Sequence, residues 1–208
     1  KPVQEILAER FPRSMQLAFM AVAMSFTGGI AIGVISAVKQ DTWMDYVARV
    51  FVVGGLSLPS FFTGILLIFF LLKVFGWIPP IGFKSFFEDP IQNLTQMIWP
   101  ALILAYLGSA PVARMTRSQM LEVIRQDYIR TARAKGLKEQ VVINRHALKN
   151  ALLPVITLSG VSLGRLLGGV VIVETIFTIP GMGTGIISAV TNIDYPMIQA
   201  FIFVIALT

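Results

Sequence analysis

The chain has 208 residues, of which 55% are hydrophobic and 13% charged, and its formal net charge is +6. This balance and a mean hydropathy of +0.76 exclude an ordinary soluble domain and indicate a membrane protein. The lack of cysteine excludes disulfides and thiolate metal sites, and the single histidine, His146, is too few for a histidine metal cluster.

The first two predicted elements lie in residues 1–38. Residues 1–13 place apolar side chains at helical spacing, which suits a short amphipathic helix at a membrane interface, and Pro12 would end this helix. Residues 14–38 carry no charge and exceed the roughly 20 residues that cross a hydrocarbon core. Small residues recur every four positions along this span and predict close packing against another helix; they are Ala21, Ser25, Gly29, Gly33 and Ala37.

The second predicted span, residues 50–72, follows a short polar connection and contains Gly54, Gly55 and Pro59. Glycine and proline inside a membrane helix usually mark a kink that neighbouring helices compensate. Broken spans often line substrate pathways, which makes Pro59 a candidate pathway residue, although both residue types are common in membrane helices in general.

Three further spans are expected. A loop rich in proline and phenylalanine leads to a shorter span at residues 97–113, a fourth span follows at residues 151–173, and a fifth begins at residues 197–208. Between the third and fourth spans lies the one long polar interval of the chain, residues 114–150. The predicted fold class is therefore all-α, in a polytopic membrane protein.

The polar interval carries most of the charge. Its residues 114–149 hold nine basic side chains against three acidic ones, so their net charge of +6 equals that of the whole chain. Lysine and arginine accumulate in cytoplasmic loops, and this places the interval on the inner side of the membrane. A loop that only sets topology would also explain the charge. Nucleic acid is not an expected partner, because aromatic residues are not interleaved with the basic ones.

The interval also has an internal order that charge alone does not require. Asp127 can N-cap a short helix over residues 128–135, and Gly136 can take the left-handed position that ends it. A second helical stretch can begin at residues 138–139 and continue into the fourth span until Pro154 disturbs it. The prediction is a helix, a glycine bend and a second helix.

Two segments carry a family resemblance. Residues 130–136 (RTARAKG), followed after nine residues by residues 146–154 (HALKNALLP), resemble the "EAA" cytoplasmic loop of ATP-binding-cassette importer permeases. Residues 173–183 (VETIFTIPGMG) resemble the V-E-x-x-F-x-x-P-G-x-G segment of the same proteins. Four positions depart from the general EAA pattern in a way that is typical of the dipeptide, oligopeptide and nickel branch; they are Arg130, Thr131, His146 and Lys149.

This resemblance implies a type I importer transmembrane domain over residues 1–208, with about five of six spans present and one more before Lys1. The chain begins without Met and its last span stops at Thr208, so it is expected to be an excerpt. The implied function is half of a translocation pathway in the prokaryotic cytoplasmic membrane. The implied substrates are di- and oligopeptides or a related solute, such as nickel chelates, haem or glutathione.

The resemblance also implies partners. They are a second, homologous permease subunit, with a heterodimer favoured, two ATP-binding subunits that hold ATP and Mg²⁺, and an external substrate-binding protein. The sequence contains neither a G-x-x-x-x-G-K-[ST] phosphate loop nor a nucleophilic catalytic set. This chain is therefore expected to bind no cofactor, to be no enzyme and to take its energy from the partners.

The ordered part of the polar interval is the expected coupling site, which would take up ATPase motion and rock the spans. Ala132 and Ala134 would permit close approach of the ATPase, and basic side chains of the same segment would face acidic groups. The residues expected at this site are Asp127, Arg130, Thr131, Ala132, Arg133, Ala134, Lys135, Gly136, His146, Leu148, Lys149, Asn150 and Pro154.

Two charged residues join Pro59 as candidate pathway or gate residues. Arg165 lies inside the fourth span, where a charge is costly and should face a cavity or a partner, unless it snorkels or makes a structural contact between helices. Glu174 lies at the outer end of this span, and a solvated interface carboxylate is the alternative. Pro180 and Gly181 would then reverse the chain before a short helix.

Two other classes of function remain open at this stage. An ion-coupled secondary transporter or channel would need intramembrane acids that face a cavity, and none lies clearly inside a span. A membrane enzyme would need a buried polar constellation, which the sequence does not show. An importer permease would co-purify with ATPase subunits, whereas proteins of the other two classes would not.

Overall fold

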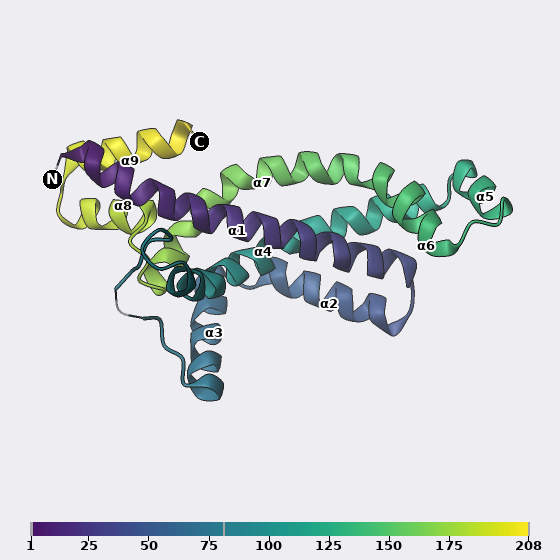
Figure 1. The fold of residues 1–208 in the computed structure, drawn as a ribbon, viewed down its shortest axis with the longest axis horizontal. Coiled ribbons are helices and arrows are strands. Elements are labelled where there is room, and N and C mark those ends of the chain that lie inside the picture. Colours follow the sequence, from purple (N-terminus) through teal and green to yellow (C-terminus); the bar gives the residue numbers. More distant parts are fainter. Residues whose placement is uncertain (1, 81, 208) are drawn as a thin grey trace. The chain divides into compact units, whose positions relative to one another are not determined.

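The computed structural model describes residues 2–80 and 82–207, with the side chains of residues 158, 159 and 161–169 left out. All regular elements in the described ranges are helical, which confirms the predicted all-α class (Figure 1). In chain order they are α1 (Val3–Val38), α2 (Trp43–Ser57), α3 (Ser60–Phe75), α4 (Pro90–Ile124), α5 (Asp127–Ala134), α6 (Glu139–Val141), the π-helical turn η1 (Val142–Ala147), α7 (Leu148–Ile176), α8 (Met182–Thr191) and α9 (Tyr195–Leu207).

Within the described residues, α1 and α4 are each long and apolar enough to cross a membrane alone. The helices α2 and α3 pass the same test only together, as a broken span or a re-entrant loop, and the break falls at Leu58 and Pro59. The 36 residues of α1 extend over about 54 Å, which exceeds a hydrocarbon core of about 30 Å. Part of α1 must therefore project beyond the membrane.

The chain divides into two compact units. Unit 1 comprises Lys1–Val22, Leu58–Ala105 and Leu163–Thr208, and unit 2 comprises Ala23–Ser57 and Tyr106–Ser162. Each unit is therefore built from segments that lie far apart in the sequence.

In unit 1, α8 and α9 pack against the first turns of α1. Their buried residues Met182, Ala189 and Phe201 form a cluster that also contacts apolar side chains of α1, including Phe11. The prediction that Pro12 ends the first helix is wrong, because Pro12 lies inside α1. Packing on this cluster holds the segment helical on both sides of the proline, so tertiary contacts override the lost hydrogen bond.

The long loop before α4 is also fixed within unit 1. Asn93 is fully buried, accepts a hydrogen bond from Gln16 Nε2 at 2.5 Å and donates one to the Lys84 carbonyl at 2.8 Å. Gln96 donates to the Gly82 carbonyl at 2.8 Å. These amides satisfy loop carbonyls that no helix or strand could pair.

In unit 2, the small residues of α1 allow α4 to approach closely. A Cβ atom on Gly29 would lie 2.7 Å from the Val112 side chain, and one on Gly33 would lie 2.6 Å from the Thr116 side chain. A Cβ atom on Gly55 of α2 would meet the Ala110 side chain at 3.1 Å. The predicted packing seam along α1 is therefore confirmed for Gly29 and Gly33.

In unit 2, the helix of the third predicted span reaches into the polar interval. The predicted span of residues 97–113 lies within α4, which continues without interruption to Ile124. The continued helix buries Met120 in a cluster with Ile129 and Val142. Since this apolar stripe finds partners within the polar interval, the helix has no reason to end at the boundary of the apolar stretch.

Candidate functional site

The predicted coupling segment folds as a helix, a glycine bend and a second helix, which we call the knob (residues 127–147). Gly136 has a φ of +77°, so the prediction of a left-handed bend is confirmed. A Cβ atom on Gly136 would meet nothing within 4 Å. This glycine is therefore required for its conformation and not for space.

The start of α5 differs from the prediction by one residue. The N-cap is Gln126, whose backbone is extended with ψ of 150°, and Asp127 is the first helical residue. The Asp127 carboxylate is exposed and pairs with Arg130 at 3.4 Å. Asp127 thus acts in the first turn, where a negative charge favours the helix dipole, and the prediction that it is the N-cap is wrong.

The inner face of the knob packs on the ends of longer helices. Ile129 and Ala132 of α5 are buried in one cluster with Met120 of α4 and with Val142 and Ala147 of η1. Ala132 is 7% exposed, so its small side chain lets α5 sit on its own chain. Ala134, by contrast, is exposed. The close approach of a partner at Ala132 and Ala134 stays a prediction.

An ion pair closes the glycine bend. Arg133 donates from Nε to Glu139 Oε2 at 3.1 Å and from Nη2 to Oε1 at 2.7 Å. The hydrogen bonds from Arg133 lower the pKa of the Glu139 carboxyl, and those bonds raise the pKa of Arg133 in turn. Both side chains are about half exposed, so the bidentate geometry orients the two helices more than it stabilises them.

The second half of the knob leads directly into α7. Asn150 donates from Nδ2 to the Tyr128 hydroxyl at 2.8 Å and so connects α7 to α5. Pro154 lies inside α7, which continues to Ile176, so the predicted disturbance at this proline does not end the helix. Ala151 and Val155 are fully buried on either side and hold the helix in place. The π-helical form of η1 was not predicted, because no residue pattern in this segment indicated it.

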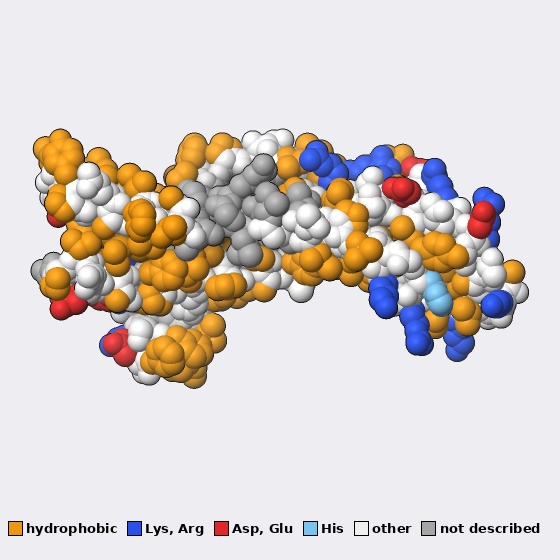
Figure 2. Space-filling view, turned by 90° about the horizontal axis from the view of Figure 1, so that it is seen from above, with side chains coloured by type: hydrophobic (Ala, Val, Ile, Leu, Met, Phe, Trp, Pro, Cys, Tyr) orange, Lys and Arg blue, Asp and Glu red, His pale blue; other side chains and the backbone are white. Residues whose placement is uncertain are grey.

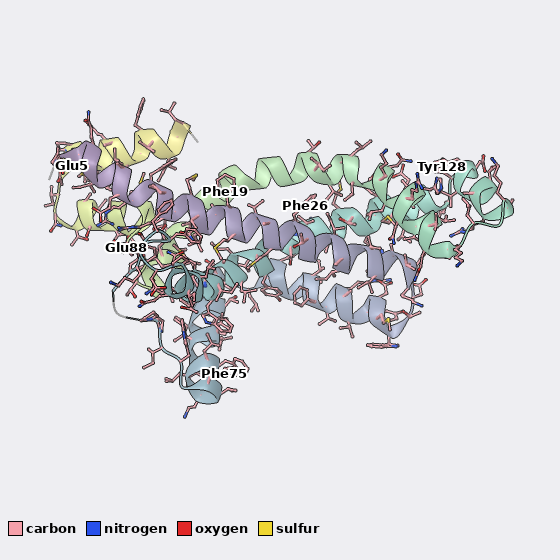
Figure 3. The ribbon with its side chains drawn as sticks, in the orientation of Figure 1. Glu5, Phe19, Phe26, Phe75, Glu88 and Tyr128 are labelled. Atoms are coloured by element: carbon pink, nitrogen blue, oxygen red, sulfur yellow. The ribbon has the colours of Figure 1, made fainter. Side chains whose placement is uncertain are left out.

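The outer surface of the knob is basic with isolated apolar side chains. Lysine and arginine side chains gather over the end of unit 2 that carries α5 and α6 (Figure 2). Tyr128, labelled in Figure 3, Leu137 and Val141 are exposed large hydrophobics that the sequence analysis missed. Of the other predicted coupling residues, His146 and Leu148 are half-buried, and the exposed ones are Arg130, Thr131, Lys135, Lys149 and Asn150.

The second motif forms a buried carboxylate clamp in unit 1, which we call the Glu174 clamp (Ser14, Glu174, Gly183 and Thr184). Glu174 accepts hydrogen bonds from Ser14 Oγ at 2.5 Å, from the Gly183 N–H at 2.8 Å and from the Thr184 N–H at 3.2 Å. Gly183 and Thr184 lie in the first turn of α8, where N–H groups have no partner in the helix. The carboxylate therefore caps α8.

Glu174 is fully buried, and the alternative of a solvated interface carboxylate is therefore wrong. Ser14 completes the cap, because its Oγ accepts the Met182 N–H at 2.7 Å. Arg10 and Arg13 of α1 donate to the carbonyls of Gly181 and Pro180 at 3.0 and 3.2 Å. These three residues of α1 were not identified from the sequence, since nothing near them resembles a motif.

The glycines of this motif are needed for space. A Cβ atom on Gly181 would overlap the Glu174 carboxylate, and one on Gly183 would overlap the Val171 backbone and lie 2.9 Å from Glu174 Oε2. The reversal at Pro180 and Gly181 and the short helix after it are confirmed by α8. The P-G-x-G spacing thus fits the turn around a buried carboxylate.

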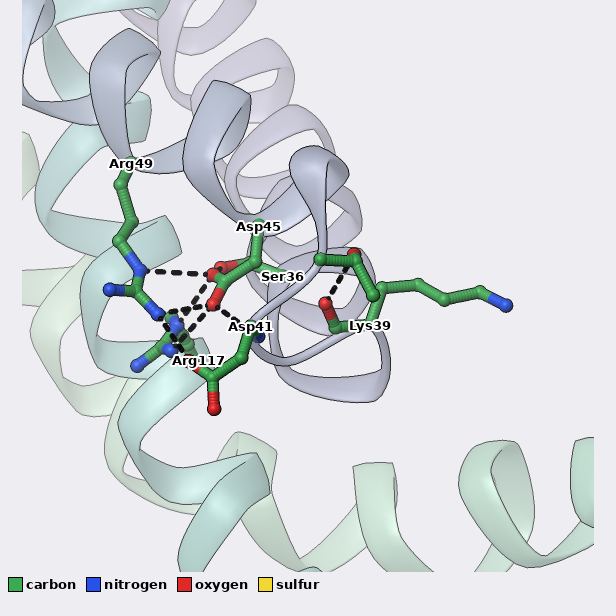
Figure 4. Close-up of polar contacts among 7 residues, drawn as sticks. Ser36, Lys39, Asp41, Asp45, Arg49 and Arg117 are labelled. Carbon is green, nitrogen blue, oxygen red and sulfur yellow. Dashed lines mark hydrogen bonds and ion pairs between the residues drawn. The ribbon is translucent and has the colours of Figure 1, made fainter.

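A third polar cluster, around Asp45 in unit 2, was not predicted (Figure 4). Arg117 donates to the Asp45 carboxylate from Nε at 3.0 Å and from Nη2 at 2.9 Å, and Arg49 binds both carboxylate oxygens. Ser36 Oγ and the Asp41 N–H also donate to Asp45. The spacing of Asp45 and Arg49, which lie four residues apart, was the signal in the sequence that could have indicated this cluster.

The remaining pathway candidates are placed as follows. Pro59 is the extended residue before α3, with φ of −63° and ψ of 145°, and it is exposed. Arg165 lies outside the residues whose side chains are described. Within the described residues, no contact joins Pro59 to the Glu174 clamp.

Known proteins are similar to this chain in fold or in sequence. A crystal structure described as an amino acid ABC transporter with histidines aligns over 98% of this chain and 92% of its own, with a TM-score of 0.66 and 18% identity. A peptide transport system permease protein of Brucella suis is 42% identical over 199 residues, which are 96% of this chain. The dipeptide permease of Haemophilus influenzae is 39% identical over 99% of this chain.

This chain spans 63% of the length of the Brucella relative and 68% of the length of the Haemophilus relative. A family model described as "Binding-protein-dependent transport system inner membrane component" matches residues 29–208. That description agrees with the apolar helices of a multi-pass inner membrane protein. The resemblance found in the two motifs is thereby confirmed, and the chain belongs to the family of ABC importer permeases, the inner membrane components of binding-protein-dependent transport systems.

Proposed function

We propose that this chain forms half of the translocation pathway of an ATP-driven importer of di- or oligopeptides. The relatives named above are peptide and dipeptide permeases, and a glutathione permease of Pectobacterium atrosepticum is 38% identical over the full chain. Glutathione is itself a small peptide, so the three names agree on one substrate class. The proposal concerns the importer permease as a whole, and this chain spans 63% and 68% of the lengths of the Brucella and Haemophilus relatives.

The observation that carries the proposal is the shared core of the knob. Ile129 and Ala132 of α5 pack directly on α4 and on η1, which continues into α7, and Ala37 at the end of α1 joins the same cluster. A push on α5 therefore reaches the ends of three long helices without passing through a flexible loop. Such packed elements move as rigid bodies, as alternating access requires.

The proposed partners follow from this role. Two ATP-binding subunits would hold ATP and Mg²⁺ and dock on the basic knob at the cytoplasmic side. A second, homologous permease would complete the pathway, and an external binding protein would deliver the peptide. This chain contributes the knob and one wall of the pathway, and the ATP-binding subunits supply the energy.

The described buried acids favour an ATP-driven importer over an ion-coupled transporter. Within the described side chains, the buried carboxylates are Asp45 and Glu174. Asp45 is held by two arginines, and Glu174 is held by three hydrogen bonds. An ion-coupling acid should instead face a cavity where it can exchange its ion.

A matched pair of glycines tests the coupling role. Gly136 and Gly76 have φ of +77° and +64°, and a Cβ atom at either position would meet nothing within 4 Å. Proline cannot adopt a positive φ and lacks the N–H, so Gly136→Pro and Gly76→Pro introduce the same local strain. Each complete importer would be reconstituted in proteoliposomes, and ATP-driven dipeptide uptake would be measured.

We expect Gly136→Pro to assemble with its partners and to lose uptake, because the bend that orients α5 is lost. Gly76→Pro, at the end of α3, should retain uptake near the wild-type rate. Wild-type uptake by Gly136→Pro would contradict a coupling role for the knob. Equal loss in both variants would show that strain alone, and not its position, disables the protein.

A further inference from the structure

An open cavity of unit 2 combines a basic end with an apolar end. It has a volume of about 340 Å³ and lies between α1, α2 and α4. The basic end is lined by Arg49, Arg114 and Arg117, and the apolar end by Val52, Val53 and Leu56. The cavity is separate from the knob and from the Glu174 clamp, and neither motif accounts for it.

The basic end retains capacity for an anion. Arg49 and Arg117 share the Asp45 carboxylate, yet their side chains stay 42% and 24% exposed. Each guanidinium has five N–H donors, of which Asp45 engages only part. Arg114 is exposed, and within the described part of the chain its side chain has no hydrogen bond or ion pair. Three guanidiniums therefore line the open cavity, and of these Arg49 and Arg117 bind the buried Asp45 carboxylate. Arg49 also pairs with the exposed Asp41 carboxylate at 3.3 Å.

The two ends are arranged along the direction of the helices. From Arg49 to Leu56, α2 rises by about 10 Å, and the side chains change from basic to apolar over that distance. Val53 and Leu56 are 59% and 48% exposed. With the polar interval on the cytoplasmic side, the basic end lies at the inner membrane surface and the apolar end points into the hydrocarbon.

This pattern matches one class of ligand. We propose that the cavity binds an anionic phospholipid of the inner leaflet, with its phosphate on Arg114, Arg49 and Arg117 and an acyl chain along Val53 and Leu56. Guanidiniums bind phosphate oxygens in a bidentate manner, and basic pockets between membrane helices suit anionic headgroups. A free phosphate would leave the apolar end uncovered. The proposal rests on the membrane orientation of the proposed function and not on the transported substrate.

The test measures lipid binding to the full-length permease in its purified complex. Delipidated complex would be titrated with phosphatidylglycerol, phosphatidylcholine or inorganic phosphate, and bound lipid would be counted by native mass spectrometry. Arg114→Gln should weaken phosphatidylglycerol binding about fivefold, the factor for one arginine at an anionic membrane surface. Arg125→Gln is the matched control, since Arg125 is also exposed on the inner side and does not line the cavity.

A second variant examines the apolar end. Val53→Trp fills that end with a bulky side chain at an exposed position, so it should weaken phosphatidylglycerol binding and leave the fold intact.

Equal binding of phosphatidylglycerol to Arg114→Gln and Arg125→Gln would overturn the proposal. Binding of inorganic phosphate that depends on Arg114 would identify a free-anion site instead. Equal binding of phosphatidylcholine and phosphatidylglycerol would reduce the cavity to an apolar groove. If Arg114→Gln lost dipeptide uptake without any change in its lipid binding, that result would also count against the lipid site. The proposed function would then still stand.

Discussion

The knob and the Glu174 clamp both turn the chain at a glycine, but the glycine is required for different reasons. Gly136 in the knob has a φ of +77° and open space around its Cα, so a side chain there would be strained and would touch nothing. Gly181 in the clamp has a φ of −99°, which any residue can adopt, but a Cβ atom there would overlap the Glu174 carboxylate.

The charged groups of the knob and of the clamp also differ in their exposure to water. The knob carries its ion pair between Arg133 and Glu139 on the surface, where water screens it. The clamp holds Glu174 fully buried, and its oxygens accept hydrogen bonds from Ser14 and from the first turn of α8. The clamp is therefore expected to contribute mainly to stability, whereas the proposed coupling role of the knob depends on its shaped and charged surface.

The largest effect is expected from Glu174→Leu. Leucine leaves the N–H groups of Gly183 and Thr184 and the Ser14 hydroxyl without their acceptor. Each buried group that loses its partner costs about 1–3 kcal/mol, so the free energy of unfolding should fall by about 4 kcal/mol in total. Thermal unfolding of the purified permease in detergent measures this change.

The control is Glu5→Leu in the same unit, at an exposed position labelled in Figure 3. It makes the same chemical change without leaving a buried donor unpaired. A similar melting temperature for Glu174→Leu and Glu5→Leu would show that the clamp does not stabilise the fold. The contrast between a structural clamp and a functional knob would then fail.

The elements with strong local signals were predicted correctly. The glycine bend at Gly136, the packing seam at Gly29 and Gly33, and the reversal at Gly181 are confirmed, because each depends on a residue whose local chemistry allows few alternatives. The expected helix end at Pro12 and the solvated Glu174 were wrong. Both depend on what packs beside them, and a single residue pattern does not show this.

The polar clusters illustrate the same limit. Asp45 pairs with Arg117, which lies 72 positions away, and Ser14 reaches Glu174, which lies 160 positions away. Along the sequence, Asp45 lies in the short polar connection before the second predicted span, and Ser14 begins the uncharged stretch of the first. Only the fold brings these groups together, whereas the knob could be predicted because all its parts lie within one interval.

The second prediction compares two substitutions at each glycine. Asparagine tolerates a positive φ better than alanine does, so Gly136→Asn should be less destabilising than Gly136→Ala, which costs about 1 kcal/mol. At Gly181 the order should reverse, because the larger side chain overlaps the pinned Glu174 carboxylate more, and overpacking by alanine alone costs about 2 kcal/mol. Melting temperatures of the four variants test the order. The same order at both positions would contradict the distinction between conformation and space.

The smallest effect concerns the ion pair of the knob. Arg133 lowers the pKa of Glu139 in the folded protein, so the pair stabilises the knob above the unfolded pKa, near pH 4.3, and this contribution disappears as the pH falls through the folded value. Because both side chains are about half exposed, Glu139→Gln should cost only about 0.5 kcal/mol at pH 7.

Hydrogen exchange of the Gly136 and Leu137 amides, compared at pH 7 and pH 4, would measure the local opening. We expect the variant to increase opening at pH 7, and we expect its difference from the wild type to shrink as the pH falls below the unfolded pKa. A large loss of global stability in Glu139→Gln would place this pair with the clamp, as a part of the fold. A small, local and pH-dependent change would agree with the proposed role of the pair, which is to set the angle at which α5 meets a partner.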